Sequence, residues 1–378
     1  MVNLLNKNFK KKLPLSKKKT IYIVGTNGLP VRYGGWDMLL HNLTLTLSKE
    51  YNIIVYTSSF EALKGIHSHN GASIKLIPLK ANGFQSIIYD FVSMLHASFN
   101  RADYILVLGV SGGIFFPIFR LFKSKIILNP DGAEWKRTKF NRFVKMFLKL
   151  SEKIAVKFSD KVITDNKIMS KDILHSYDVH SSVIEYGGDH VRKIPLTEVT
   201  ASSYKIKSNN YAFKVCRIVP ENNIEMILEA FSKTQFKLLL IGNWNNSQFG
   251  IDIRQKYNNN NNLLLLDPIY DQEKLDELRS NCRIYVHGHS VGGTNPSLVE
   301  AMHLALPCLI YGVNYNIETT ESSAEYFLSE KDILSGLSKL WNNEEYINSM
   351  GNSLLQIAEK RYLWSSIILK YKNVIESD

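Results

Sequence analysis

The chain has 378 residues, of which 45% are hydrophobic, and a formal net charge of +11. This composition excludes a disordered or fibrous protein, and the length predicts two domains, because single cores rarely grow beyond about 250–300 residues. The three cysteines, Cys216, Cys282 and Cys308, are spaced too widely for a disulfide framework or a zinc site and indicate a reducing, cytoplasmic compartment. The N-terminus lacks a signal-peptide core, and the longest apolar run, 104–119, is interrupted by glycines and a proline, which is atypical of a membrane span.

Positive charge is concentrated in the first half of the chain. Residues 1–190 hold 27 Lys/Arg and 14 Asp/Glu, a net of +13, whereas residues 191–378 hold 19 and 21, a net of −2. This asymmetry predicts an acidic partner for the first half, either a membrane surface or a nucleic acid. Residues 1–20 form a basic tail, typical of a solvated and disordered segment, that includes Lys10, Lys11, Lys12, Lys17, Lys18 and Lys19.

The first half alternates strands and helices, which predicts a Rossmann-like α/β domain over residues 21–191. The expected strands are 21–25, 53–56, 74–78, 104–108, 125–128 and 162–164. The first strand leads into a glycine-bearing loop and a helix at 38–48, where Gly34 and Gly35 would let a substrate phosphate approach the backbone. The dinucleotide fingerprint GxGxxG is absent from this loop.

The segment NPDGAEW, residues 129–135, follows the expected strand 125–128. Open α/β sheets place their ligands at the carboxyl ends of the strands, so Asp131 and Glu134 are candidates for contacts to sugar hydroxyls or for general acid–base work. The alternative is a turn carboxylate followed by a helix-entry carboxylate.

Residues 136–161 predict a long basic amphipathic helix. Its cations step by three and four residues and share one face: Arg142, Lys145, Lys149, Lys153 and Lys157. An apolar side is formed by Phe140, Phe143, Val144, Phe147, Ile154 and Phe158. Helices of this kind lie on anionic lipid, and the alternative is the solvated outer face of a packed helix. No nucleic-acid-binding motif and no aromatic residues interleaved with the basic face are present, so nucleic acid is not expected as a partner.

The second half predicts another Rossmann-like domain over residues 208–360, after a polar linker at 192–207. Its expected strands are 212–215, 237–241, 263–267 and 282–286, and its expected helices are 224–231 and 272–280. The closing segment 341–371 is helical, and residues 361–378 form a C-terminal helix that can cross back to the first domain.

The most informative stretch is HGHSVGGTNPSLVEAM, residues 287–302, which predicts a strand end, a glycine loop and a helix start. Asn295 is a good N-cap, and Pro296 fits the first helical position. Gly292 and Gly293 permit a tight turn, so the loop and helix start form a candidate phosphate site, with Glu300 one turn into the helix. The alternative is an ordinary capped helix that follows a strand.

Several motifs together resemble the retaining GT-B glycosyltransferases of family four, and most of all the bacterial rhamnosyltransferases of polysaccharide (O-antigen and capsule) assembly. They are GTNGLPVRYGGWD (25–37), DGAEWKR (131–137), YGGDH (186–190), RIVPENNIEMILEAF (217–231), GNWNNS (242–247) and HGHSVGGTNPSLVEAM (287–302). The resemblance covers essentially the whole chain after the tail. It implies two Rossmann-like domains that face a central cleft, with the sugar nucleotide held mainly by the C-terminal one.

The resemblance also implies residue roles. Arg217 would pair with the donor diphosphate, and Glu300 would hold the ribose. Gly293, Thr294 and Asn295 would bind the β-phosphate. The other expected donor contacts are Gly34, Gly35, Asn222, Asn243 and His289, and the expected catalytic residues are Arg217, Asp131 and Glu134. The chain departs from many relatives in two places: Asn222 and Asn223 stand where they have a lysine, and Gly292 stands where they have a glutamate.

The resemblance predicts a retaining enzyme without a protein nucleophile, a cofactor or a bound metal. The expected donor is dTDP-rhamnose and the expected acceptor a lipid-diphosphate-linked saccharide. The basic helix would hold the enzyme on the anionic inner face of the cytoplasmic membrane. A UDP-hexose donor is the alternative within the same fold, and a non-catalytic sugar-nucleotide-binding scaffold is the alternative of another class.

Overall fold

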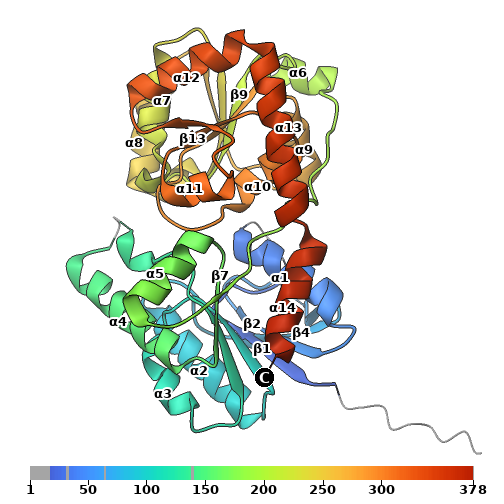
Figure 1. Cartoon of the computed structure of the whole chain (residues 1–378), viewed down its shortest axis with the longest axis vertical. Coiled ribbons are helices and arrows are strands. Elements are labelled where there is room, and N and C mark those ends of the chain that lie inside the picture. The colour runs from blue at the N-terminus through green and yellow to red at the C-terminus, as the bar shows by residue number, and fades with distance from the viewer. Residues whose placement is uncertain (1–17, 31–33, 64, 138–139, 378) are drawn as a thin grey trace, which may run out of the picture.

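The computed structural model describes residues 18–30, 34–63, 65–137 and 140–377. It forms two α/β domains stacked along the long axis of the molecule (Figure 1). Of the lysines predicted to form the tail, Lys10, Lys11, Lys12 and Lys17 lie outside the described residues.

The N-terminal domain is built on one mostly parallel sheet. Its strands are β1 (Thr20–Val24), β2 (Asn52–Ser58), β3 (Ser68–His69), β4 (Ala72–Ile77), β5 (Tyr104–Leu108), β6 (Lys125–Asn129), β7 (Lys161–Thr164) and β8 (Ser182–Val183). They are arranged in the order β3-β4-β2-β1-β5-β6-β7-β8, and the β3–β4 pair is antiparallel. Its helices are α1 (Gly35–Leu47), α2 (Gln85–Phe99), α3 (Phe116–Phe119), α4 (Arg142–Phe158) and α5 (Lys167–Tyr177), with 3-10 turns at Gly113–Phe115 and Glu134–Lys136.

The C-terminal domain has a parallel sheet in the order β11-β10-β9-β12-β13-β14. The strands are β9 (Ala212–Val215), β10 (Leu238–Ile241), β11 (Leu263–Leu266), β12 (Ile284–His287), β13 (Cys308–Tyr311) and β14 (Glu325–Phe327). The helices are α6 (Glu198–Tyr204), α7 (Ile224–Ser232), α8 (Gln248–Tyr257), α9 (Gln272–Ser280), α10 (Pro296–His303), α11 (Asn314–Thr319), α12 (Glu330–Asn342) and α13 (Glu344–Arg361), and a last helix, α14 (Trp364–Glu376), follows this domain. Two 3-10 turns lie at Pro220–Asn222 and Trp244–Asn246.

Both sheets have the doubly wound order, which confirms the two predicted Rossmann-like domains. Central strands such as β5 and β9 are buried along their whole length, because helices cover both faces of a parallel sheet. The strand order reverses between β1 and β5 in one sheet and between β9 and β12 in the other. Ligands of such folds bind at the carboxyl ends of the strands near these points.

The predicted helix over 136–161 is wrong at both ends. Helix α4 begins at Arg142, where the Asn141 side chain caps it by accepting the Val144 N–H at 3.0 Å. It ends at Phe158, because Lys161 already belongs to β7. Residues 134–136 instead form a separate 3-10 turn.

The segment expected to be a linker, 192–207, is packed against the C-terminal domain and contains α6. The backbone N–H of Arg192 donates to Asp276 at 3.1 Å, and that of Thr197 donates to Glu277 at 2.8 Å, so α9 holds the segment in place. The Thr197 hydroxyl also donates to Glu277 at 2.7 Å, so a polar side chain of the segment takes part in this packing.

The C-terminal helix α14 lies on the N-terminal domain, beside α1 (Figure 1). Its buried residues Trp364, Ile367, Ile368 and Tyr371 belong to the same hydrophobic cluster as β1 and α1. The chain therefore crosses between the domains twice, once before α6 and once between α13 and α14.

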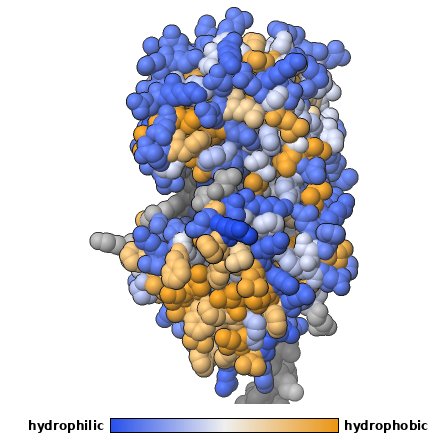
Figure 2. Space-filling view, turned by 90° about the vertical axis from the view of Figure 1, so that its left-hand side faces the viewer, coloured by the Kyte–Doolittle hydropathy of each residue, from blue (hydrophilic) through white to orange (hydrophobic). Residues whose placement is uncertain are grey.

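One face of the N-terminal domain exposes an apolar surface, which Figure 2 shows below the waist of the molecule. Helix α4 contributes Phe143, Met146 and Leu150, which are 76%, 65% and 52% exposed. Neighbouring elements add Phe84, Ile88, Phe99, Ile118 and Leu121. The buried side of α4 consists instead of Leu148, Ser151, Glu152, Ala155 and Val156. Within the described ranges, no helix combines the length and the apolar character that crossing a bilayer requires.

Candidate functional site

The N-termini of two helices, α1 and α10, meet where the domains face each other. A Cβ atom on Gly35, the first residue of α1, would lie 3.1 Å from Cγ of Pro296, the first residue of α10. Asn295 caps α10 by accepting the Ser297 N–H at 3.1 Å. Gly34 has a φ of 153°, a conformation that L side chains rarely adopt. Because a helix N-terminus carries partial positive charge, two facing N-termini favour an anion between them.

The predicted phosphate loop of the C-terminal domain packs tightly on the N-terminal domain. A Cβ on Gly293 would collide with Oδ1 of Asp165, and a Cβ on Gly132 would lie 2.5 Å from Cα of Gly292. The Thr294 hydroxyl donates to the backbone carbonyl of Asp165 at 2.5 Å. Glycine is therefore required on both sides of this contact.

Arg217 extends from the carboxyl end of β9 and is exposed to solvent. Across the cleft, Arg137 lies 3.4 Å from Asp131 and 3.5 Å from Glu134. Desolvation within the cleft and, next, the charge of Arg137 lower the pKa of Arg217. The structure thus brings the three residues predicted as catalytic, Arg217, Asp131 and Glu134, into one cluster. It adds Arg137, which the sequence reasoning missed although it closes the motif DGAEWKR.

Asp131 and Ala133 both have left-handed backbone conformations, with φ of 62° and 35°. These two residues flank Gly132 and strain the loop that follows β6. Strain of this kind concentrates at functional sites. The loop presents the Asp131 side chain toward the cleft instead of continuing the sheet.

Asn222, which is expected to contact the donor, supports the backbone of Arg217, and its donor contact stays a prediction. Asn222 is 2% exposed, and its Nδ2 donates to the carbonyl oxygen of Arg217 at 2.6 Å. Its amide is committed to holding the Arg217 backbone, so Asn222 positions the arginine. Asn243, also predicted as a donor contact, is exposed where β10 ends.

Glu300 is buried one turn into α10 and is held by two basic groups. Arg279, which is fully buried, donates to Oε2, and Nε2 of His190 lies 3.4 Å from Oε1. Although burial opposes ionisation, Arg279 and His190 lower the pKa of Glu300 to about 2. The carboxylate is therefore a permanent acceptor, and its ribose contact stays a prediction.

His287 and His289 stack with ring centroids 4.6 Å apart at the carboxyl end of β12. Burial lowers the pKa of both rings well below the usual value, so both are neutral at pH 7. His289 Nδ1 lacks a hydrogen-bond partner among the described residues, which suits a ligand contact. In the described part of the chain, no group of three or more His, Cys, Asp or Glu gathers as a metal site. Independence from metal stays a prediction.

Asp165 is a site residue that the sequence reasoning missed. It follows β7 and touches the phosphate loop at Gly293 and Thr294. Burial and the nearby charge of Asp131 raise its pKa well above the usual value. Its position directly after the predicted strand 162–164 was the signal that could have identified it.

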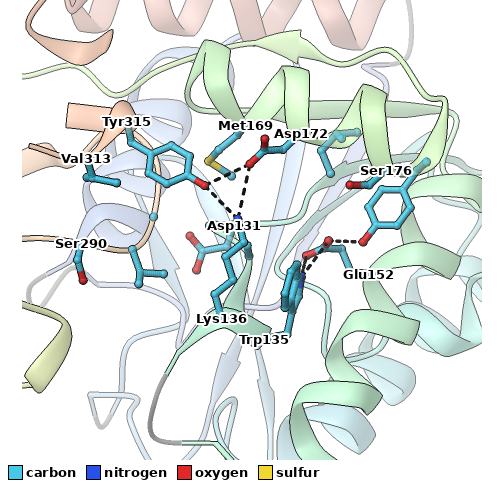
Figure 3. Close-up of a pocket in the computed structure, with 16 residues that line it drawn as sticks. Asp131, Trp135, Lys136, Glu152, Met169, Asp172, Ser176, Ser290, Val313 and Tyr315 are labelled. Carbon is cyan, nitrogen blue, oxygen red and sulfur yellow. Dashed lines mark hydrogen bonds and ion pairs between the residues drawn. The ribbon is translucent and has the colours of Figure 1, made fainter. Parts of the chain in front are cut away.

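A cavity of about 420 Å³ opens beside Asp131, between the two domains (Figure 3). Glu152 of α4 accepts hydrogen bonds from Trp135 Nε1 at 3.2 Å and from the Tyr177 hydroxyl at 2.5 Å. On the opposite wall, the hydroxyl of Tyr315 lies 3.2 Å from both Lys136 Nζ and Asp172 Oδ2. Of the residues that line this cavity, the sequence analysis had named only Asp131, for sugar contacts, and Gly292, in the phosphate loop, as site candidates.

Two family models divide the chain as the domains do. Residues 18–189 match a domain of unknown function (DUF1972), and residues 198–353 match the glycosyl transferases group 1. A comparison with curated protein sequences found no match.

Solved structures share the whole architecture. Sucrose-phosphate synthase from Thermosynechococcus elongatus has a TM-score of 0.78 at 14% identity. The match covers 95% of this chain and 98% of the synthase chain. Anabaena HepE, solved with UDP-glucose, has a TM-score of 0.73 at 13% identity over 96% and 100% of the two chains. A putative UDP-N-acetylglucosamine 2-epimerase from Listeria monocytogenes has a TM-score of 0.64 at 14% identity over 96% of each.

At identities this low, the structural likeness establishes the fold alone, and proteins with different names share it. The family model adds to this likeness, because it matches the part of the chain that carries Arg217, the phosphate loop and Glu300. Residues 198–353 therefore match the glycosyl transferases group 1, and the chain as a whole has the GT-B fold.

Proposed function

We propose that the protein transfers a sugar from a nucleotide-sugar donor, with retention of anomeric configuration, to a lipid-diphosphate-linked saccharide at a membrane surface. One observation carries the proposal: positive groups converge on the cleft from both domains. The N-termini of α1 and α10 meet there, and Arg217 faces Arg137 across it. A nucleoside diphosphate carries the complementary charge and geometry.

In this transfer, Arg217 and the start of α10 bind the donor diphosphate, while Glu300 accepts hydrogen bonds from the ribose. The diphosphate leaves on the face that the acceptor attacks, and the departing phosphate takes the acceptor proton. The protein supplies positioning and charge stabilisation, which are large terms when the donors are preorganised. Arg279 and Asn222 support the site by fixing Glu300 and the Arg217 backbone.

For the donor, we infer dTDP-rhamnose from the resemblance of the motifs to rhamnosyltransferases. A UDP-hexose is the second candidate, and the HepE structure solved with UDP-glucose supports it. A thermal-shift comparison of dTDP-rhamnose with UDP-glucose discriminates between them, because a ligand at 100 times its Kd stabilises by about 2.7 kcal/mol. Stabilisation by UDP-glucose alone would overturn the rhamnose assignment.

The membrane part of the proposal rests on α4, which carries Arg142, Lys145, Lys149, Lys153 and Lys157. In the same helix, Phe143, Met146 and Leu150 are exposed, so cations and apolar side chains share the outer surface. This combination favours binding to the anionic inner face of a cytoplasmic membrane, where cations meet headgroups and apolar side chains enter the interface. A packed helix with a merely solvated outer face would bury these apolar residues instead.

Product analysis tests the reaction itself. NMR of the isolated glycoside should show the anomeric configuration of the donor, and turnover should survive EDTA. An inverted product would overturn the retaining mechanism, and a strict requirement for a divalent ion would overturn metal independence. The scaffold alternative is excluded once the protein turns over any nucleotide sugar.

A further inference from the structure

The cavity of Figure 3 lies beside the donor loop but is built from other residues. None of Arg217, His289, Thr294, Asn295 and Glu300 lines it, and most of its lining belongs to the N-terminal domain. Ser290, Val291 and Gly292 line the cavity and continue directly into Gly293 and Thr294, where the donor phosphate is expected. A molecule in the cavity would therefore lie next to the donor.

The cavity wall presents an aromatic ring in a fixed orientation. Trp135 Nε1 lies 3.2 Å from each carboxylate oxygen of Glu152, which is only 4% exposed and also accepts from Tyr177. Glu152 therefore acts as a positioning residue for the indole. A fixed indole with carboxylates nearby suits a sugar ring, whose C–H face packs on the indole while its hydroxyls donate to the carboxylates.

The cavity is complete only when both domains contribute. Tyr315 comes from the C-terminal domain, and its hydroxyl joins Lys136 and Asp172 of the N-terminal domain (Figure 3). Asp131, which also belongs to the cluster of Arg217, Arg137 and Glu134, lines the same cavity. A sugar placed here would contact both domains next to the point where Arg217 and Asp131 converge.

Helix α4 connects the cavity with the membrane-facing surface. Glu152 faces the cavity, and Lys149 places its Nζ 4.9 Å above the Trp135 ring. Lys145 and Arg142 follow at steps of four and three residues, so they continue this face along the helix. The row of three cations runs beside the exposed apolar residues, which matches a diphosphate between a sugar and a lipid.

We propose that this cavity holds the reacting sugar of the acceptor, with Trp135 as the stacking platform and Arg142, Lys145 and Lys149 as contacts to the acceptor diphosphate. The inference rests on the proposed function, because it presupposes a saccharide acceptor. The acceptor hydroxyl oxygen bonds to the anomeric carbon of the donor. The bond from that carbon to the diphosphate breaks with its electron pair on the diphosphate, which also receives the hydroxyl proton.

The test compares acceptor and donor parameters for Trp135→Ala, Trp135→Phe and Tyr315→Phe. The probes are short-chain alkyl diphosphates that carry glucose, galactose, N-acetylglucosamine or N-acetylgalactosamine, with dTDP-rhamnose and UDP-glucose as donors. Acceptor KM should rise more than about tenfold in Trp135→Ala, and less in the two phenylalanine variants, which each remove one hydrogen-bonding group. The Kd of the donor nucleotide should change less than about twofold, since neither Trp135 nor Tyr315 is among the residues expected to bind the donor.

Tyr346→Phe is the matched control for Tyr315→Phe. Tyr346 lies on α13, away from the cavity. Its hydroxyl donates to Glu325 and accepts from Lys339, so it also joins one carboxylate and one lysine. Its removal should leave acceptor KM unchanged. If circular dichroism shows that Trp135→Ala folds poorly, the acceptor KM of Trp135→Phe and Tyr315→Phe decides the test instead.

Three outcomes overturn the inference. Acceptor KM could stay unchanged in all variants, or the donor Kd could rise in parallel, which would assign the cavity to the donor sugar. The wild-type protein could also hydrolyse a nucleotide sugar yet neither bind nor glycosylate any of the four probes. A wild-type protein that neither binds nor turns over any nucleotide sugar would instead refute the proposed function.

Discussion

The two domains share a topology and differ in how they treat charge and apolar surface. The N-terminal half has a net charge of +13, and it carries most of the exposed large hydrophobic side chains, such as Phe143 and Leu121. The C-terminal half has a net of −2, and its buried carboxylate Glu300 is paired with Arg279. The C-terminal domain thus holds its charged groups in a paired, buried site, while the N-terminal domain exposes cations and apolar side chains on its surface.

The largest effect is expected from Arg217→Ala, which removes the main cation of the C-terminal half of the site. Charge-assisted hydrogen bonds to phosphate contribute in ground and transition state, so donor KM should rise and kcat should fall. We expect kcat/KM to drop about 1,000-fold, measured by nucleotide release, because two such bonds of about 1.5–3 kcal/mol are lost.

Membrane binding by the N-terminal domain should be untouched in this variant. Arg283→Ala is the control in the same domain, because Arg283 pairs with Glu344 away from the cleft. Full kcat/KM in Arg217→Ala would remove the donor-site assignment.

The next effect tests the N-terminal domain alone, through Lys145→Glu, Lys149→Glu and Lys153→Glu combined. Each lysine near an anionic surface contributes about 1 kcal/mol, so co-sedimentation with anionic liposomes should weaken at least 100-fold. Because salt screens this attraction, wild-type binding should also weaken at high ionic strength. Thermal shifts with nucleotides should match the wild type.

The matched control reverses three exposed lysines of the C-terminal domain, Lys207, Lys331 and Lys360. This control should bind liposomes as the wild type does. Equal binding by both triple variants would show that net charge alone, and not the α4 surface, attracts the protein.

A smaller effect should come from Phe143→Ser with Met146→Ser, which leaves the charge of α4 unchanged. Burying an apolar side chain in the interface contributes about 1–2 kcal/mol, so liposome binding should weaken about tenfold or more, and the loss should persist at high salt. Both residues are exposed, so thermal stability should not fall. Unchanged binding at high salt would mean that α4 attracts lipid by charge only.

The smallest expected effect concerns the pH dependence of stability, where the two domains should respond in opposite pH ranges. Burial raises the pKa of Asp90, in the N-terminal domain, from 3.8 to about 7, despite an N–H donated by Gly112 at 3.0 Å. The folded protein thus binds this proton more tightly than the unfolded chain does. The stability it contributes is complete below about pH 4 and is lost as pH rises through 7.

Asp90→Asn should therefore raise the melting temperature at pH 8 and change it little at pH 4. Glu300 behaves in the opposite way, because its pKa of about 2 lies below 4.5. Its contribution is present above about pH 4.5 and is lost as pH falls through 2. A melting temperature of Asp90→Asn that shifts equally at pH 4 and pH 8 would contradict the assignment to Asp90.

Much of the fold was predictable because buried parallel strands are short apolar runs bounded by loops. The bounds of β5, β9 and α9 agree with the predicted ranges. The start of α4 was missed, since its apolar and basic periodicity continues upstream of the cap at Asn141. Periodicity reports which residues share a face, whereas the cap reports where a helix begins.

The candidate site was predictable only in part. Asp131, Gly293, Thr294 and Asn295 were identified because glycine loops and carboxylates after strands have local signatures. Arg137, Asp165, Glu152 and Tyr315 were not, because their roles depend on which distant segments meet. The support that Asn222 gives to the Arg217 backbone was not predicted, because nothing local distinguishes an amide that faces a ligand from one that holds the neighbouring backbone.

By itself, the sequence determined the two α/β halves, the capped start of α10 and the concentration of cations on α4, since each depends on residues within one or two turns. Only the tertiary structure decided which side of α4 is exposed, because Leu148 and Ala155 are buried and Phe143 is left exposed. It also decided that Gly132 meets Gly292 and that Tyr315 reaches Lys136. Those contacts join residues far apart in the chain, and packing of the two domains is the physical cause that brings them together.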